Sequence, residues 1–179
     1  MAFHAHQRST VTEQEFLALP ETTDRVELLD GEVFVSPSPS RRHQRVLLDL
    51  VAALHTWSRA HPPTAIGLAP QDVRFGPSRI LQPDAFVVLA GLADDVSGPI
   101  DVVPDVVIEV LSGRRSVDRI TKRVVYAEAS VPEYWVVDPE EARVEIHHGL
   151  VLARVEEEAV TSTRLPGFSL PLAGWLRPA

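Results

Sequence analysis

Apolar residues recur along the chain with two different periods, which predict helices and strands. The helical period runs through three segments, residues 12–19, 40–60 and 116–129. Strand-like alternation or short continuous apolar runs occupy residues 25–29, 32–36, 65–69, 72–75, 81–89, 105–111, 134–137, 143–148 and 151–155. Strands around two long helices favour a mixed α/β fold. We expect one domain over residues 12–176 behind a flexible segment, residues 1–11.

Local signals fix where some of these elements begin and turn. Thr12 and Glu15 form a capping box at the start of the first helix. Asp30-Gly31 separates two short strands and is typical of a two-residue hairpin. The proline-rich turn 36–40 ends in a serine that can cap the second helix. The tail, residues 165–176, is irregular but apolar enough to pack on the core.

The composition is that of a globular protein and excludes several functional classes. Of the 179 residues, 45% are hydrophobic and 23% are charged, which is enough for a substantial core. The chain has no cysteine, so disulfides and thiolate metal sites are excluded. No apolar stretch is long enough to span a membrane and no signal peptide is recognisable, so we expect a cytoplasmic protein without a membrane partner. The formal net charge of −8 means that contact with nucleic acid must depend on a local patch or a bound cation.

Two carboxylates interrupt apolar strands, where an unpaired charge is costly. Asp84 lies within the predicted strand 81–89 and Glu109 within 105–111. Because consecutive strands usually lie side by side, we expect the two acids to meet. Neighbouring carboxylates repel each other unless one is protonated or a divalent cation lies between them, and oxygen ligands favour Mg²⁺ or Mn²⁺ over zinc. The alternative for each acid is a salt bridge to an arginine.

The chain contains a single lysine, Lys122, among 17 basic residues. Asp118, Lys122 and Tyr126 recur every four residues and so share one face of the predicted helix 116–129. This helix follows the strand of Glu109 and must pack back on the sheet, which brings Lys122 toward the two acids. Two acids, a metal ion and a lysine are suited to phosphodiester hydrolysis. The alternative is that Lys122 forms only a helix salt bridge with Asp118.

The order and spacing of several motifs resemble the Uma2 family over nearly the whole chain, from about residue 12 to residue 176. The motifs are Glu27-Leu28-Leu29-Asp30-Gly31-Glu32, the serine–proline turn before His43, Gln82-Pro83-Asp84, Pro104-Asp105-Val106-Val107-Ile108-Glu109-Val110-Leu111-Ser112, the helix residues Asp118, Lys122 and Tyr126, and Val131-Pro132-Glu133-Tyr134-Trp135-Val136-Val137-Asp138. Members of this family are described as putative endonucleases of the PD-(D/E)xK superfamily. The resemblance implies a restriction-endonuclease-like fold, in which helices flank a central mixed β-sheet.

The resemblance also implies functions for particular residues. Asp84, preceded by a proline, and Glu109 match the acids of the superfamily signature. With the Val110 carbonyl they would bind Mg²⁺ or Mn²⁺. The lysine expected two residues after Glu109 is replaced by Leu111, and Lys122 from the following helix would take over its catalytic function. The implied activity is metal-dependent endonucleolytic hydrolysis of phosphodiesters in DNA.

Further residues are candidates for supporting functions. Glu27 matches an early acid of the family and would add a third carboxylate, and the alternative is a surface glutamate. His43 lies on the apolar stripe of its helix, which suits either a partly buried histidine or a phosphate contact. Asp118 and Tyr126 share the face of Lys122. A single nuclease site cuts one strand, so a homodimer is compatible with this chemistry. The alternative to an active enzyme is a catalytically silent binding or assembly module with a nuclease fold.

Overall fold

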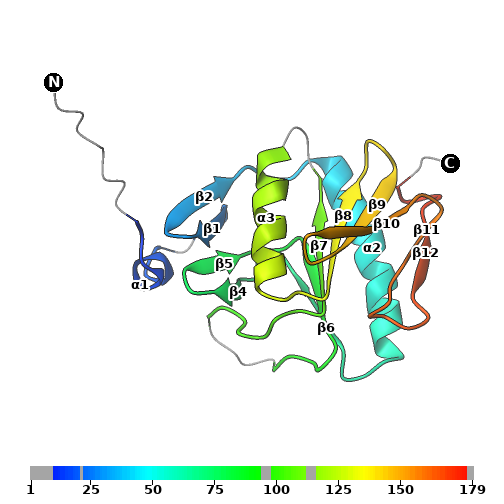
Figure 1. Ribbon diagram of the computed structural model, residues 1–179, viewed down its shortest axis with the longest axis horizontal. Helices are drawn as coiled ribbons and strands as arrows, with labels where there is room; N and C mark the ends of the chain where they lie inside the picture. Colours follow the sequence, from blue (N-terminus) through cyan, green and yellow to red (C-terminus); the bar gives the residue numbers. More distant parts are fainter. Residues whose placement is uncertain (1–9, 21, 94–97, 112–115, 177–179) are drawn as a thin grey trace.

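A computed structural model describes residues 10–20, 22–93, 98–111 and 116–176, with side chains of the last range described from residue 120 (Figure 1). The helices of this part are α1 (Glu13–Leu17), α2 (Arg41–Arg59) and α3 (Ser116–Glu128), and none of them is long and apolar enough to cross a membrane. The strands are β1 (Arg25–Leu29), β2 (Glu32–Ser36), β3 (Ala65–Leu68), β4 (Val73–Gly76), β5 (Arg79–Leu81), β6 (Ala85–Val88), β7 (Val106–Val110), β8 (Glu133–Asp138), β9 (Arg143–His148), β10 (Val151–Glu156), β11 (Ala159–Thr161) and β12 (Ser169–Pro171).

The strands of the described residues form a large central sheet and two smaller sheets. The central sheet has six strands in the order β10-β9-β8-β7-β6-β3. Its neighbours β7 and β8 are parallel, and its other neighbouring pairs are antiparallel. Helix α3 connects the parallel pair, because parallel strands need a long crossover. A four-stranded sheet, β2-β1-β5-β4, lies beside it, and β11 pairs with β12.

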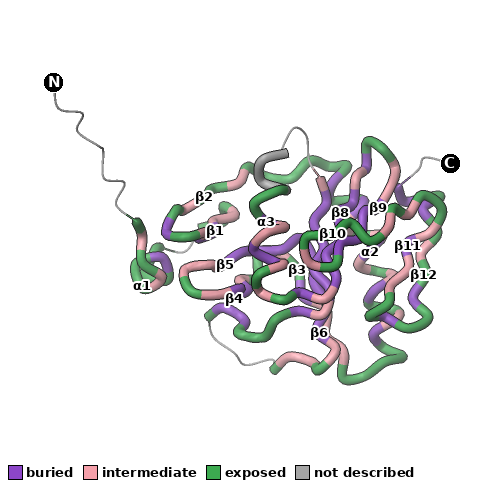
Figure 2. The backbone as a smooth tube through the Cα atoms, viewed as in Figure 1, coloured by how far each residue is buried: buried purple, intermediate pink, exposed green. Residues whose placement is uncertain are grey.

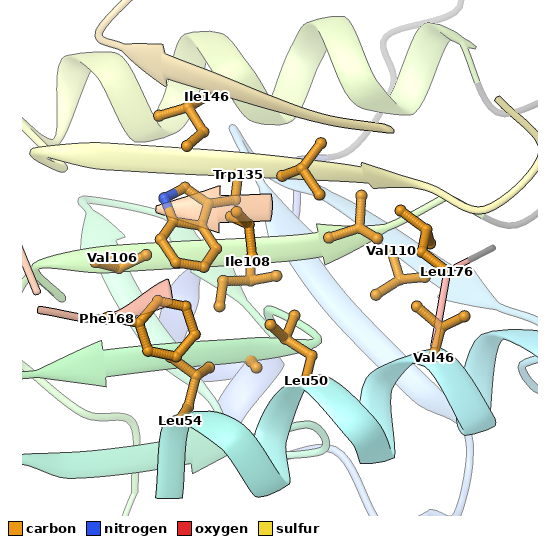
Figure 3. Close-up of a cluster of buried hydrophobic side chains, with 14 of the residues drawn as sticks. Val46, Leu50, Leu54, Val106, Ile108, Val110, Trp135, Ile146, Phe168 and Leu176 are labelled. Carbon is orange, nitrogen blue, oxygen red and sulfur yellow. The ribbon is translucent and has the colours of Figure 1, made fainter. Parts of the chain in front are cut away.

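Helix α2 covers one face of the central sheet (Figure 3). Its apolar stripe is the one expected from the helical period, with Val46, Leu50 and Leu54 fully buried. These side chains pack against the sheet residues Ile108 and Trp135 and against the C-terminal tail. In Figure 2 the purple, buried positions gather along the strands of the central sheet.

Helix α3 covers the opposite face of the sheet, as Figures 1 and 3 show. Val125 and Tyr126 pack there against the strand residues Val107 and Val136. Side chains alternate between the two faces of a strand, so Glu109, two residues after Val107, shares the face that α3 covers. The fold thus directs one strand carboxylate toward the helix that carries the lysine.

The segment predicted as one strand over residues 81–89 is two strands that belong to different sheets. Residues 79–81 form β5 of the four-stranded sheet, and residues 85–88 form β6 of the central sheet. Pro83 lacks a backbone N–H and cannot donate to a ladder, which explains the break. The chain crosses from one sheet to the other over residues 82–84. Asp84 lies at this crossing rather than within a strand.

The hairpin at Asp30-Gly31 is confirmed. Both residues have positive φ, 50° and 84°, as a tight two-residue turn requires, and Val26 pairs with Val35. Of the predicted flexible segment, residues 1–9 lie outside the described residues. The tail is more regular than predicted, because its residues 169–171 pair with 159–161.

Glu133, at the start of β8, is a buried carboxylate that binds the C-terminal part of the chain. Trp135 Nε1 donates to it at 2.9 Å, the Ser162 hydroxyl at 2.8 Å and the Thr163 backbone N–H at 2.8 Å, and the Thr163 hydroxyl also donates. Burial raises the pKa of Glu133, but these hydrogen bonds outweigh burial and hold the pKa below its ordinary value. The ionised carboxylate therefore ties the segment before the tail to the sheet.

We expect Glu133→Gln to lower the free energy of unfolding by about 2–3 kcal/mol at neutral pH, because an amide would direct N–H groups at donors. The stabilisation by Glu133 is present above the ordinary glutamate pKa of about 4.3 and is lost as the pH falls through the lower folded value. Urea denaturation should therefore show a difference between variant and wild type that shrinks as the solution is acidified. A difference independent of pH would contradict this function of Glu133.

Candidate functional site

The sheet crossing and β7 bring the two predicted acids together. Asp84 Oδ2 accepts a hydrogen bond from the Val110 backbone N–H at 2.7 Å, and Glu109 is the preceding residue on β7. The side chains of Asp84 and Glu109 are only 3% and 11% exposed. The expectation that their two segments lie side by side is confirmed, because β6 and β7 pair antiparallel.

Helix α3 holds Glu109 through two side chains. Tyr126 Oη donates to Glu109 Oε1 at 2.7 Å, and Lys122 Nζ donates to the same oxygen at 3.1 Å. Lys122 and Tyr126 are one helical turn apart and share a face, as their spacing predicts. The Lys122 side chain is only 6% exposed, so its ammonium lies inside the cluster. The side chain of Asp118, the third predicted member of this face, lies outside the described residues.

Glu27 joins the same cluster from β1 and is buried, so the alternative of a surface glutamate is wrong. Its Oε1 accepts hydrogen bonds from Lys122 Nζ at 2.9 Å and from the Gln82 backbone N–H at 2.8 Å. The strand order places β1 beside β5, which leads directly into the sheet crossing. Glu27 therefore links the four-stranded sheet to the lysine of α3.

Arg25 is the member of the cluster that the sequence analysis did not single out. Its Nη1 lies 2.6 Å from Asp84 Oδ1, and its Nη2 lies 3.5 Å from both Glu27 Oε1 and Glu109 Oε2. It also donates to the Gln82 carbonyl. The alternative for Asp84 and for Glu109 was a salt bridge to an arginine. Arg25 forms this salt bridge with both acids. Its position two residues before Glu27, on the same strand face, becomes informative only once Glu27 is placed in the cluster.

The charges in the cluster shift the pKa values of its acids in opposite directions. Burial and the neighbouring Glu109 raise the pKa of Asp84, although Arg25, His43 and the Val110 N–H partly oppose them. Burial also acts to raise the pKa of Glu109, but the charges of Lys122 and Arg25 and the hydrogen bonds from α3 lower it below its ordinary value. Glu109 is therefore the firmly ionised acid, and Asp84 is the acid that holds a proton more readily.

A pocket of about 420 Å³ opens beside Asp84. Arg25, His43 and Gln82 line it near the acid, and the apolar walls are residues Pro37, Pro39, Leu47, Leu48, Val51, Leu68 and Pro70. His43 is buried, as its position on the apolar stripe suggests, and its Nε2 lies 3.6 Å from Asp84 Oδ1. Its Nδ1 is buried and has no hydrogen-bond partner among the described residues. The pocket therefore joins a polar end at Asp84 to an apolar end at α2.

The carboxylates of Asp84 and Glu109 fit a magnesium or manganese ion whose coordination shell would be completed by substrate and water. The described residues contain no group of three or more histidine, aspartate or glutamate side chains arranged to hold a metal ion. Mg²⁺ commonly takes only one or two carboxylates and completes its shell with water and phosphate. Asp84 Oδ1 and Glu109 Oε2 converge on one cationic group, the Arg25 guanidinium, and both donors are oxygen. Two carboxylates that already share a cation form a donor set of this kind.

The family model Uma2, described as "Putative restriction endonuclease", matches residues 13–173. Among solved structures, the fold is similar to the crystal structure of a putative nuclease belonging to DUF820 from Anabaena variabilis ATCC 29413. The TM-score is 0.78 and the identity 22%, over 93% of this chain and 99% of that chain. No match was found among curated proteins. The similarity shows that the fold is restriction-endonuclease-like.

Proposed function

The chain belongs to the Uma2 family, and we propose that it is a metal-dependent endonuclease that hydrolyses phosphodiesters in DNA. One observation carries the proposal: Asp84 from the sheet crossing, Glu109 from β7 and Lys122 from α3 meet in one buried cluster beside a pocket. Buried ion pairs add little net stability, so three carboxylates and two cationic side chains in contact favour a function other than holding the core together. Perturbed acids in or beside a pocket are typical of functional sites.

Asp84, Glu109 and the Val110 carbonyl are the groups that would hold Mg²⁺ or Mn²⁺. When bound, the ion supplies Lewis-acid polarisation of a phosphate oxygen and of a water molecule. The Val110 N–H fixes the orientation of the Asp84 carboxylate, and Tyr126 fixes that of Glu109. Burial raises the pKa of Tyr126 and the nearby acids raise it further, so the phenol stays protonated and keeps donating.

Lys122 is the group proposed to orient the attacking water and to neutralise charge on the phosphate. Its ammonium is held between Glu27 and Glu109, so it is positioned before substrate arrives. The pocket beside Asp84 is large enough for part of one nucleotide and has an apolar end for a base or sugar. His43, at the polar end, is a supporting group for a phosphate.

The direct test is cleavage of DNA by the purified full chain. We expect nicking or degradation with Mg²⁺ or Mn²⁺ at low salt, and loss of cleavage when a chelator is added. Low salt matters because a protein with a net charge of −8 binds phosphates weakly. An Asp84→Asn variant purified in parallel controls for contaminating nucleases. If single-stranded, duplex and branched DNA all stay intact with both metals, the binding-module alternative replaces this proposal.

A further inference from the structure

Arg25 lies where a divalent cation shared by Asp84 and Glu109 would lie. Its guanidinium is 2.6 Å from Asp84 Oδ1 and 3.5 Å from Glu109 Oε2. The second oxygen of each acid is engaged elsewhere, because Asp84 Oδ2 accepts from the Val110 N–H at 2.7 Å and Glu109 Oε1 accepts two hydrogen bonds from α3. The two oxygens that Arg25 contacts are therefore the ones left for a metal ion.

We propose that Arg25 is an internal counter-cation of the acid cluster, which a divalent ion must displace in order to bind. This inference rests on the proposed metal-dependent function. With all three carboxylates ionised, the two cations Arg25 and Lys122 leave the cluster with one negative charge. A divalent ion added beside Arg25 would reverse that sign inside a buried site, whereas a divalent ion that replaces Arg25 would bring the charge to zero. Mg²⁺ binds oxygen at about 2.1 Å, which a guanidinium on the same oxygens opposes by repulsion and by occupying the space.

The pocket beside Asp84 can receive the displaced guanidinium. The Arg25 side chain is 20% exposed, and that side chain lines the pocket beside Asp84. In the pocket its planar fork would meet a phosphate of the substrate, for which it is well suited. Metal loading and phosphate binding would then be coupled, since the ion frees the arginine that the phosphate needs.

Titration calorimetry with Mn²⁺ on the full chain tests the competition. We expect Arg25→Gln to bind Mn²⁺ about tenfold more tightly than wild type, or better, because the ion no longer has to displace a charge. Arg74→Gln is the matched control. Arg74 also pairs with carboxylates, Glu13 and Asp101, but it lies on β4, two strands from β1. Its removal changes the net charge equally and should change the Kd by less than about twofold.

Two further measurements keep the test decisive if Arg25→Gln is unstable without metal. Saturating Mn²⁺ should raise the melting temperature of Arg25→Gln more than that of wild type, because the ion replaces the missing cation. Arg25→Lys keeps the charge but cannot contact the Asp84 and Glu109 oxygens at the same time. The Mn²⁺ affinity of Arg25→Lys should therefore lie between that of wild type and that of Arg25→Gln. Unchanged or weaker binding by Arg25→Gln would overturn the inference and leave Arg25 as a fixed part of the site. If neither wild type nor Arg25→Gln binds Mn²⁺, the proposed metal-dependent function fails as well.

Discussion

With Asp84 replaced by asparagine, the protein is expected to lose tight Mn²⁺ binding, and its turnover is expected to fall about a thousandfold. The variant keeps an oxygen that can accept from the Val110 N–H, but it removes one of the two carboxylates proposed to hold the metal. Lewis-acid stabilisation by a metal is worth several kcal/mol, and each 1.36 kcal/mol is about a tenfold change in rate. Calorimetry and a DNA-nicking assay measure the two losses separately.

The same substitution should leave the fold intact. Three carboxylates share two cationic side chains in the cluster, so removing one negative charge brings the buried charges into balance. We expect the melting temperature of Asp84→Asn without metal to hold or to rise. Asp30→Asn is the matched control and should leave Mn²⁺ affinity unchanged. Asp30 also pairs with an arginine, Arg79, at 2.6 Å. Its positive φ of 50° is one that asparagine tolerates. Metal affinity that survives in Asp84→Asn would remove Asp84 from the site.

The acids and the lysine could be predicted from the sequence because each one breaks a local pattern. Asp84 and Glu109 interrupt apolar runs, and Lys122 is the single lysine of the chain, at helical spacing from Tyr126. Strand adjacency and the crossover helix then suffice to bring them together. The hairpin before α2 could be predicted for a similar reason, since Asp30-Gly31 is a local turn signal.

Arg25 and the strand break before β6 could not be predicted in this way. Arg25 is one of many arginines. Its importance depends on its contacts with Asp84 and Glu109, which lie 59 and 84 positions farther along the chain. The break at Pro83 is locally visible, but the passage of the chain between two sheets is a tertiary property. The partners of Glu133 lie about thirty residues farther along the chain, in a segment without a helical or strand period. Sequence patterns reveal residues that are unusual where they stand, and they do not reveal ordinary residues made important by a distant partner.

Replacement of Lys122 by arginine separates a catalytic lysine from a merely neutralising one. Lys122 contacts Glu27 at 2.9 Å and Glu109 at 3.1 Å, and an arginine would still neutralise both acids. If neutralisation were its whole function, turnover would stay within a few-fold of wild type. A catalytic ammonium is different, because the wider planar fork of arginine cannot take the same position beside a water or phosphate. We therefore expect turnover to fall by about a hundredfold or more, as when one transition-state contact is lost.

Mn²⁺ affinity and melting temperature identify the cause of the loss of turnover in Lys122→Arg. Mn²⁺ affinity of Lys122→Arg should stay close to wild type, because the positive charge that lowers the pKa of Glu109 is retained. Lys122→Met removes that charge. The Glu109 pKa then rises, so protons compete with Mn²⁺ and the affinity should fall as the pH is lowered. Melting temperatures of both variants check that the buried side chain is accommodated. Wild-type turnover in a folded Lys122→Arg would show that Lys122 only balances charge, and the catalytic function would have to be assigned to a different residue.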